Sequence, residues 1–252
     1  MSTTPAAATV AIIGGTGFGK ALVPGTPFTQ TTEYGDAALT RADLGGGRTL
    51  IFAARHGAGH TLPPHLINHR ANIAALRDLG VDAVFATTAV GSLQKAVAPG
   101  DALILSDFLD FTKTGPVTFF ETPGQVRHTD FVHPYDPTLR ALLLDTAPTS
   151  EALTVHPTGT YLCVSGPRYE TPAEVRLFAS WGADVVGMTG APEAILCREA
   201  GLRYASVSLA TNYGTGLLSD APLSHTEVKE QMASRRAALA EWLLRAARAV
   251  TA

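Results

Sequence analysis

The chain has 252 residues, of which 46% are hydrophobic and only 16% are charged, and its formal net charge at pH 7 is −3. This composition excludes an intrinsically disordered protein, which is poor in apolar residues, and the slight acidic excess argues against a general nucleic-acid binder. Any anionic ligand must therefore be held by a local site.

Strand-like and helix-like segments alternate along the chain, beginning with a short apolar run at 10–13 that ends at Gly14-Gly15. The last helix is the clearest, because Ser224 and Glu227 form a capping box before apolar residues at helical spacing. Apolar runs predict further buried strands at 49–54, 81–88, 102–105, 160–164, 183–188 and 204–210. Helical spacing and first-turn prolines predict helices at 66–79, 137–144, 172–181 and 192–200.

This alternation predicts an α/β fold, a single domain over residues 1–252 with a central mixed, largely parallel β-sheet flanked by helices. No apolar run approaches the length of a membrane span, and residues 1–9 lack the features of a secretory signal. Cys163 and Cys197 lie in apolar runs, which is typical of buried, unpaired cysteines in a reducing compartment. We therefore expect a soluble cytoplasmic protein.

A glycine-rich turn follows the first predicted strand, from Gly14 to Lys20. Backbone N–H groups in such a turn can hold an anion. The segment departs from the dinucleotide-binding pattern, because Lys20 stands where that pattern has glycine. It also lacks the magnesium-binding hydroxyl of a triphosphate loop, because Ala21 follows the lysine. A triphosphate-dependent enzyme is an alternative that this turn leaves open.

Other strand ends carry side chains that suit an anion. Arg55 and His56 follow the second predicted strand, and Thr88 closes the third. Because carboxyl ends of parallel strands gather at one edge of a sheet, we expect Thr16, Arg55 and Thr88 to lie close together. A guanidinium group matches two phosphate oxygens at once. The histidine-rich stretch at 56–69 leaves a metal site as a weaker alternative, since no convincing acidic ligand accompanies it.

Short motifs occur in order along nearly the whole chain: GGTG at 14–17, ARHG at 54–57, TTAVGSL at 87–93, PGD at 99–101, GPRYET at 166–171, GADVVGMT at 182–189 and ATN at 210–212. Together they resemble the trimeric purine nucleoside phosphorylase and methylthioadenosine phosphorylase family, and overall the methylthioadenosine branch. The resemblance implies a homotrimer whose site lies near a subunit interface. It also implies cleavage of a purine nucleoside by inorganic phosphate, a co-substrate, with no metal and no organic cofactor.

The resemblance also implies roles for individual residues. Met188 would lie under the ribose, and Tyr169 would pack against the face of the base. His128 matches a position that reaches into the neighbouring subunit's site. The phosphate would be surrounded by Thr16, Arg55, His56, Thr88, the backbone of Ala89, and Thr189.

The residues expected at the purine depart from the methylthioadenosine branch. Asn212 stands where that branch has aspartate, and Gly214 where it has a second one. An amide can donate a hydrogen bond to a 6-oxo group or to N7, which a carboxylate cannot do. Glu170 matches the glutamate with which 6-oxopurine phosphorylases accept the ring N–H. Its alternative role is that of a surface glutamate capping the next helix.

His225, at the start of the last predicted helix, matches a histidine that binds the 5′-hydroxyl in the nucleoside branch. Its alternative is an exposed first-turn histidine. With Asn212 and Glu170 as the other catalytic residues, we expect a purine nucleoside phosphorylase acting on inosine and guanosine. The near alternative is a methylthioinosine or methylthioadenosine phosphorylase. A non-catalytic nucleoside-binding module is a third possibility.

Overall fold

A computed structural model describes residues 8–18, 22–112, 117–149, 153–219 and 221–251, without the side chains of residues 225 and 227. The strands are β1 (Thr9–Gly14), β2 (Thr26–Thr32), β3 (Gly35–Gly45), β4 (Arg48–Ala54), β5 (Ala83–Ser92), β6 (Ala102–Ile104), β7 (Asp107–Phe111), β8 (Val155–His156), β9 (Thr160–Val164), β10 (Val185–Gly187) and β11 (Arg203–Tyr213). The helices are α1 (His69–Asp78), α2 (Pro137–Asp145), α3 (Pro172–Ser180), α4 (Gly190–Glu199) and α5 (His225–Ala249), with a 3₁₀ turn at Pro64–Leu66.

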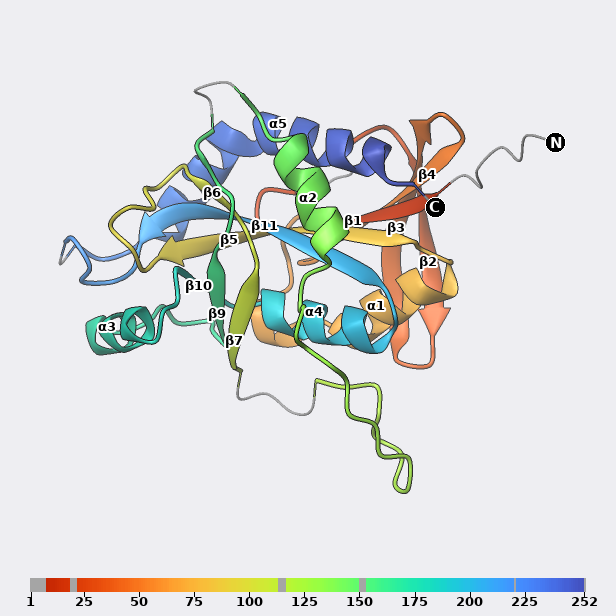
Figure 1. Cartoon of the computed structure of the whole chain (residues 1–252), viewed down its shortest axis with the longest axis horizontal. Helices are drawn as coiled ribbons and strands as arrows, with labels where there is room; N and C mark the ends of the chain where they lie inside the picture. Colours follow the sequence, from red (N-terminus) through yellow and green to blue (C-terminus); the bar gives the residue numbers. More distant parts are fainter. Residues whose placement is uncertain (1–7, 19–21, 113–116, 150–152, 220, 252) are drawn as a thin grey trace.

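All the described strands belong to one mixed sheet (Figure 1). Its main path runs β2-β3-β4-β1-β5-β10-β9-β7, and β11 lies beside β5 and leads through β6 to β8. The β1–β4, β1–β5 and β5–β11 pairs at the centre are parallel. The β2–β3, β3–β4, β5–β10 and β6–β11 pairs are antiparallel. The prediction of a mixed, largely parallel sheet is confirmed.

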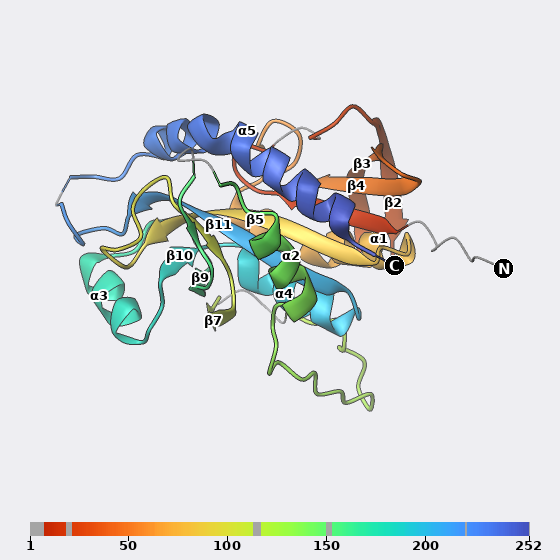
Figure 2. The ribbon, with the colours of Figure 1, turned by 45° about the horizontal axis from the view of Figure 1, so that its top comes forward.

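Helices cover both faces of the sheet, with α2 and α5 on one side and α1 and α4 on the other (Figures 1 and 2). The central strands are therefore buried on both faces, which is why they appear in the sequence as continuous apolar runs. Trp242 of α5 is fully buried, and its indole N–H donates to the carbonyl of Leu143 in α2 at 2.8 Å. The two helices on this face thus share one core.

The predicted helix at 66–79 begins later than expected. Asn68 is its N-cap and accepts a hydrogen bond from the N–H of Ala71 at 3.0 Å. The residues just before it form the 3₁₀ turn, so Leu66 lies outside the helix and is exposed. The predicted strands at 10–13, 49–54, 81–88, 102–105, 160–164, 183–188 and 204–210 all correspond to observed strands.

The segment that carries His128 runs from residue 117 to α2 without regular structure and extends away from the body of the molecule (Figure 2). Cys163 and Cys197 are buried and unpaired, as predicted. Across the described ranges, no helix combines the length and the apolar character needed to cross a bilayer.

Candidate functional site

A cavity of about 410 Å³ opens at the carboxyl ends of β1, β4, β5 and β10. The cavity is present because one edge of β5 changes its partner strand near the end of β5. β1 pairs with β5 only as far as Ala86, and β10 begins to pair at Gly91. Between them, no described strand pairs with this edge of β5. The edge of the sheet at 87–90 is therefore open to a ligand, as expected for strand ends in an α/β fold.

The open edge of β5 presents backbone groups to the cavity. The carbonyl of Thr87 points to this edge, since it accepts a hydrogen bond from Nη1 of Arg55 at 2.6 Å. Backbone groups of residues two apart point to the same edge of a strand. The N–H of Ala89, which lines the cavity, therefore faces the same edge and is placed to donate to an anion.

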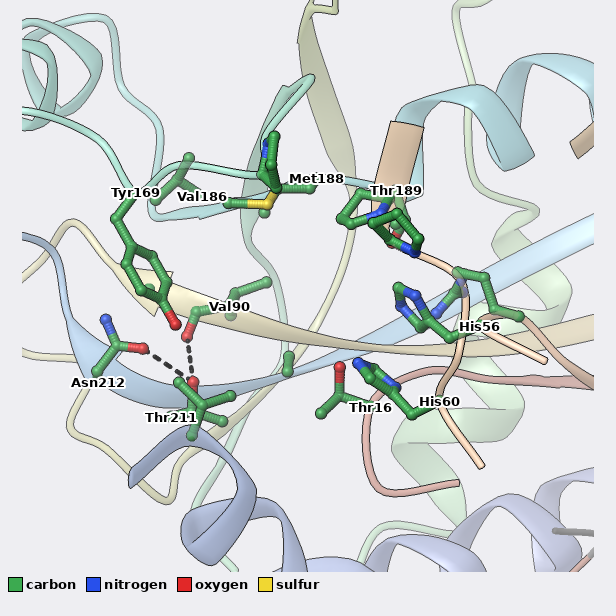
Figure 3. A pocket seen from close by; sticks show the side chains of 18 of the residues that line it. Thr16, His56, His60, Val90, Tyr169, Val186, Met188, Thr189, Thr211 and Asn212 are labelled. Carbon is green, nitrogen blue, oxygen red and sulfur yellow. Dashed lines mark hydrogen bonds between the residues drawn. The ribbon is translucent and has the colours of Figure 1, made fainter. Parts of the chain in front are cut away.

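Donor side chains gather at one end of the cavity, where Figure 3 shows Thr16, His56, His60 and Thr189 close together. Thr16 lies in the turn after β1, two residues beyond its end. Thr189 is the N-cap of α4, yet its side chain makes no capping hydrogen bond. Its backbone is fixed instead by the hydroxyl of Tyr161, which accepts from the Thr189 N–H at 3.2 Å. We call this part of the cavity the oxyanion end.

His56 is neutral at this end of the cavity. Burial, reinforced by the charge of Arg55, lowers the pKa of His56 to about 4. Its Nδ1 atom lies 2.9 Å from the carbonyl of Leu62, which can only accept, so Nδ1 carries the proton. The Nε2 atom is therefore an acceptor, suited to a protonated oxygen of an anion. The His60 ring packs on it with centroids 4.3 Å apart.

Arg55 is 1% exposed and lines the cavity from the end of β4. Its guanidinium group forms a two-point ion pair with Glu193 of α4, in which the Nη2–Oε2 distance is 2.7 Å. Burial opposes the charge of Arg55, but Glu193 outweighs it and raises the pKa of Arg55 above its ordinary value. The oxyanion end thus combines a paired cation with neutral donors and carries little excess charge.

The opposite end of the cavity holds Tyr169 and Asn212 (Figure 3). The hydroxyl oxygen of Thr211 lies 2.9 Å from Oδ1 of Asn212 and 3.2 Å from the carbonyl oxygen of Val90. The Nδ2 atom of Asn212 donates to the carbonyl of Tyr213 at 2.9 Å. These contacts fix the orientation of the amide and leave its second N–H for a ligand. We call this part of the cavity the base end.

Glu170 also lines the cavity, and it is 6% exposed. Its Oε1 atom is buried without a hydrogen-bond partner among the described residues. Burial raises the pKa of this carboxyl group. The next helix is capped by Thr171 and Glu174, which form a capping box. The alternative of a surface capping role for Glu170 is therefore wrong: the side chain is an unsatisfied buried acceptor in the cavity wall.

The structure brings most of the predicted site residues to this one cavity. Those that line it are Thr16, Arg55, His56, Ala89, Tyr169, Glu170, Met188, Thr189 and Asn212. Thr88 does not line it, because its hydroxyl is turned toward β11 and lies 2.7 Å from that of Ser208. His128 is exposed in the extended segment and lies outside the cavity of its own chain.

His225 is the first residue of α5, but its side chain lies outside what the structure describes. Val228, one turn further along α5, does line the cavity. The cavity lining also contains residues that sequence analysis did not assign to the site, including His60, Val90, Val186 and Thr211. Among the described residues, no group of three or more His, Cys, Asp and Glu side chains is arranged to hold a metal ion.

Gly15 leaves room for the Arg55 guanidinium group. A Cβ atom at residue 15 would lie 2.6 Å from Nη1 of Arg55 and 2.6 Å from the carbonyl oxygen of Thr87. We therefore expect Gly15→Ala to lower the free energy of unfolding by about 1–3 kcal/mol, as overpacking does. We also expect phosphate or sulfate to protect the native protein against thermal unfolding and the variant to lose this protection. Denaturation curves with and without these anions measure both effects, and unchanged protection would contradict the prediction.

Comparisons with known proteins all match this chain to phosphorylases. The family model described as "Phosphorylase superfamily" matches residues 9–248. A probable 6-oxopurine nucleoside phosphorylase of Dictyoglomus turgidum is 49% identical over 226 residues, covering 88% of this chain and 84% of the relative. A probable S-methyl-5′-thioinosine phosphorylase of Methanopyrus kandleri is 45% identical over 211 residues, covering 82% of this chain and 80% of the relative.

Solved structures resemble the whole fold. The methylthioadenosine phosphorylase of Schistosoma mansoni in complex with adenine superposes with a TM-score of 0.87 at 32% sequence identity. The match covers 96% of this chain and 91% of that one.

Proposed function

Because the chain belongs to the phosphorylase superfamily, we propose that it is a purine nucleoside phosphorylase that cleaves 6-oxopurine nucleosides, inosine and guanosine. The products would be the free base and ribose 1-phosphate. Its relatives include proteins named for 6-oxopurine nucleosides and for methylthioinosine. The observation that carries the 6-oxo assignment is the unsatisfied oxygen of buried Glu170, at a cavity whose base end also offers an amide N–H from Asn212.

The two residues fit a 6-oxopurine and not a 6-aminopurine. Hypoxanthine and guanine carry a hydrogen on N1, which a carboxylate accepts, and acceptors at O6 and N7, to which an amide donates. Adenine has no hydrogen on N1, so it would leave the Glu170 oxygen unsatisfied. A buried polar group without a partner costs about 1–3 kcal/mol.

In the proposed reaction, phosphate at the oxyanion end attacks C1′ of the sugar. A bond forms between a phosphate oxygen and C1′, the bond from C1′ to the base breaks, and its electron pair moves into the purine ring. Thr16, Arg55, His56, Thr189 and the Ala89 N–H would hold the phosphate in position, which removes much of the entropic barrier. Glu170 and Asn212 would stabilise the departing base through preorganised hydrogen bonds. Met188 would lie under the ribose and Tyr169 would pack against the face of the base; both residues line the cavity.

We also propose that the protein works in purine salvage in the cytoplasm and needs no metal or organic cofactor. We further propose that it is a homotrimer in which His128 of one subunit completes the site of its neighbour. The exposed position of His128 in an extended segment supports a contact outside its own chain. Light scattering coupled to size-exclusion chromatography measures the assembly. A monomer with full activity would refute the role of His128.

The test of the activity is base release from a panel of nucleosides. Inosine, guanosine, adenosine and their 5′-methylthio analogues are incubated with and without phosphate. We expect phosphate-dependent release of hypoxanthine and guanine. Methylthioinosine as the preferred substrate would favour the second candidate, a methylthioinosine phosphorylase, while preference for adenosine or methylthioadenosine would refute the 6-oxopurine assignment. The absence of any phosphate-dependent release would favour a non-catalytic module.

His225→Val is expected to separate the two candidate sugars. If His225 bonds the 5′-hydroxyl, the variant should lose about three- to tenfold in kcat/KM for inosine, the effect of one hydrogen bond. The same variant should lose less with methylthioinosine, since valine suits an apolar 5′ group. Steady-state rates on the two substrates measure the difference. Equal losses would remove His225 from the binding of the 5′ group.

A further inference from the structure

Behind the oxyanion end of the cavity, a buried acid holds the arginine that faces it. Glu193 of α4 is 2% exposed and contacts Nε and Nη2 of Arg55 with its two carboxylate oxygens. Two parallel bonds between a guanidinium and a carboxylate fix the plane of the arginine as well as its position. Sequence analysis assigned no role to Glu193.

The contacts of Arg55 leave a defined pair of donors unused. A guanidinium group has five N–H bonds. Glu193 accepts from one on Nε and one on Nη2, and the Thr87 carbonyl accepts from one on Nη1. No other described residue is bonded to this group. One N–H therefore remains on each terminal nitrogen, and each can donate to an oxygen of an anion in the cavity.

Glu193 is itself held in place. The hydroxyl of Tyr204 in β11 donates to its Oε2 atom at 3.2 Å. The Nδ1 atom of His69 in α1 lies 3.9 Å from Oε1, and burial lowers the pKa of this histidine to about 4, so it is neutral there. The Glu193 carboxylate is thus held by the Tyr204 hydroxyl of β11 and by the guanidinium group of Arg55, which supplies the positive charge beside it.

Glu193 also links Arg55 to a second residue of the oxyanion end. Thr189 and Glu193 are four residues apart at the start of α4, so they lie on one face of the helix. The ion pair therefore fastens the end of β4, which carries Arg55, to the helix that carries Thr189. The spacing between these two donors depends on the ion pair.

We propose that Glu193 is a positioning residue for phosphate, acting through Arg55. It holds Arg55 with its two remaining terminal N–H groups available to the cavity, sets the distance from Arg55 to Thr189, and offsets the arginine's charge so that fixed donors hold the anion. This inference rests on the proposed phosphorolysis at the same site. A buried ion pair is by itself weak evidence for stability, because desolvation opposes the attraction, which favours a positional role for this one.

The test is Glu193→Gln, which keeps the shape but removes the charge and one acceptor. We expect KM for phosphate to rise about tenfold or more, the effect of displacing a charge-assisted hydrogen bond, while KM for inosine changes by less than about threefold. Tyr204→Phe, which removes one bond to Glu193, should move KM for phosphate in the same direction by a smaller factor. Glu193→Asp should recover part of the loss.

Glu199→Gln is the matched control. Glu199 lies on the same helix, and its carboxylate accepts from the Thr118 hydroxyl and the Phe119 N–H, away from the cavity. This variant should leave both KM values within about twofold, as substitutions distant from a site usually do. Circular dichroism establishes that each variant is folded. If Glu193→Gln does not fold, Tyr204→Phe and Glu193→Asp provide the same comparison of the two KM values.

The proposal is overturned if KM for phosphate stays unchanged in folded Glu193 variants, or if the two KM values rise by equal factors. A second measurement needs no nucleoside: the concentration of phosphate that gives half of its full thermal protection should rise about tenfold in Glu193→Gln. If the native protein binds phosphate but cleaves no nucleoside, the proposed function fails while the role of Glu193 is still measured.

Discussion

Asn212→Asp is expected to lower the ratio of kcat/KM for inosine to that for adenosine by about ten- to hundredfold, the effect of a mismatched hydrogen bond in a buried site. The amide now uses one N–H for the Tyr213 carbonyl and has a second for the base. A carboxylate at this position can only accept. It would repel the oxygen of a 6-oxopurine and accept from the amino group of adenine.

The geometry also predicts a secondary effect of the same substitution. The atom that replaces Nδ2 would be an oxygen 2.9 Å from the Tyr213 carbonyl oxygen. Two acceptors at this distance repel each other, so the variant should be less stable than the native protein and its carboxyl pKa should be raised. Thermal unfolding in parallel with the rate measurements separates this effect from the change in substrate preference.

Asn212→Ala provides the control, since it removes the amide without adding an acceptor. Asn212→Ala should lower the rates on both substrates and change the ratio of their kcat/KM values less than Asn212→Asp does.

A variant at Gly214, the second departure from the methylthioadenosine branch, is less informative. A Cβ atom there would lie 3.1 Å from a Val175 methyl group and 3.2 Å from the Ser92 carbonyl oxygen. An unchanged ratio in Asn212→Asp would remove Asn212 from the choice of base.

The site was predictable from the sequence as far as strand ends determine it. Thr16 follows β1, Arg55 follows β4, and Thr88 lies on the last part of β5. Parallel strands bring their carboxyl ends to one edge, so these three residues were expected together. Thr16 and Arg55 do line one cavity, whereas Thr88 does not. No structural detail beyond the order of strands and helices was needed for this result.

The ion pair of Arg55 and Glu193 was not predictable in the same way. Its partners are 138 residues apart, and the first turn of a helix is a common place for an acid whatever its role. Only the packing of α4 against the sheet directs this carboxylate inward. The orientation of Thr88 was missed for a related reason: side chains alternate along a strand, and a sequence does not show which face a ligand will occupy.

The edge of the sheet was harder to predict than its centre. β2 and β3 form a hairpin in which exposed residues alternate with half-buried ones in β2 and with buried ones in β3, and β2 contains no apolar run. Buried central strands give a continuous apolar signal, while a half-exposed edge hairpin does not. The sequence therefore indicated the strands that form the site and left out those that extend the sheet beyond it.

Glu170→Gln is expected to lower kcat/KM for inosine about ten- to hundredfold, since a hydrogen bond to a charged group contributes about 1.5–3 kcal/mol. The ionised carboxylate is the active form. Because burial raises the pKa of Glu170, the rate on inosine should fall with decreasing pH at a higher pH than for an exposed glutamate. The variant should lack this acidic limb. A limb that persists unchanged in Glu170→Gln would exclude Glu170 as its source.

The same pKa shift predicts that the variant is more stable at neutral pH. An acid with a raised pKa binds its proton more tightly in the folded state, so its stabilising effect is present at low pH and is lost as pH rises through the folded pKa. In its ionised form native Glu170 is a charged, buried group with an unsatisfied oxygen, and an amide removes that charge. Higher stability with lower activity is the pattern of a residue retained for function.

Glu174→Gln is the control, and its expected change in stability at neutral pH has the opposite sign. Glu174 lies four residues away, bonds Arg168 at 2.7 Å and caps α3, and these contacts lower its pKa to about 2. Its stabilising effect is present at neutral pH and is lost as pH falls toward that value. Glutamine can keep the capping-box bond, so Glu174→Gln mainly removes the charge that pairs with Arg168. It should cost up to about 1 kcal/mol of stability at pH 7, as the loss of an exposed ion pair does, and leave the rate on inosine unchanged. If Glu170→Gln and Glu174→Gln changed stability in the same direction, the burial of the Glu170 charge would not explain the change in stability of Glu170→Gln.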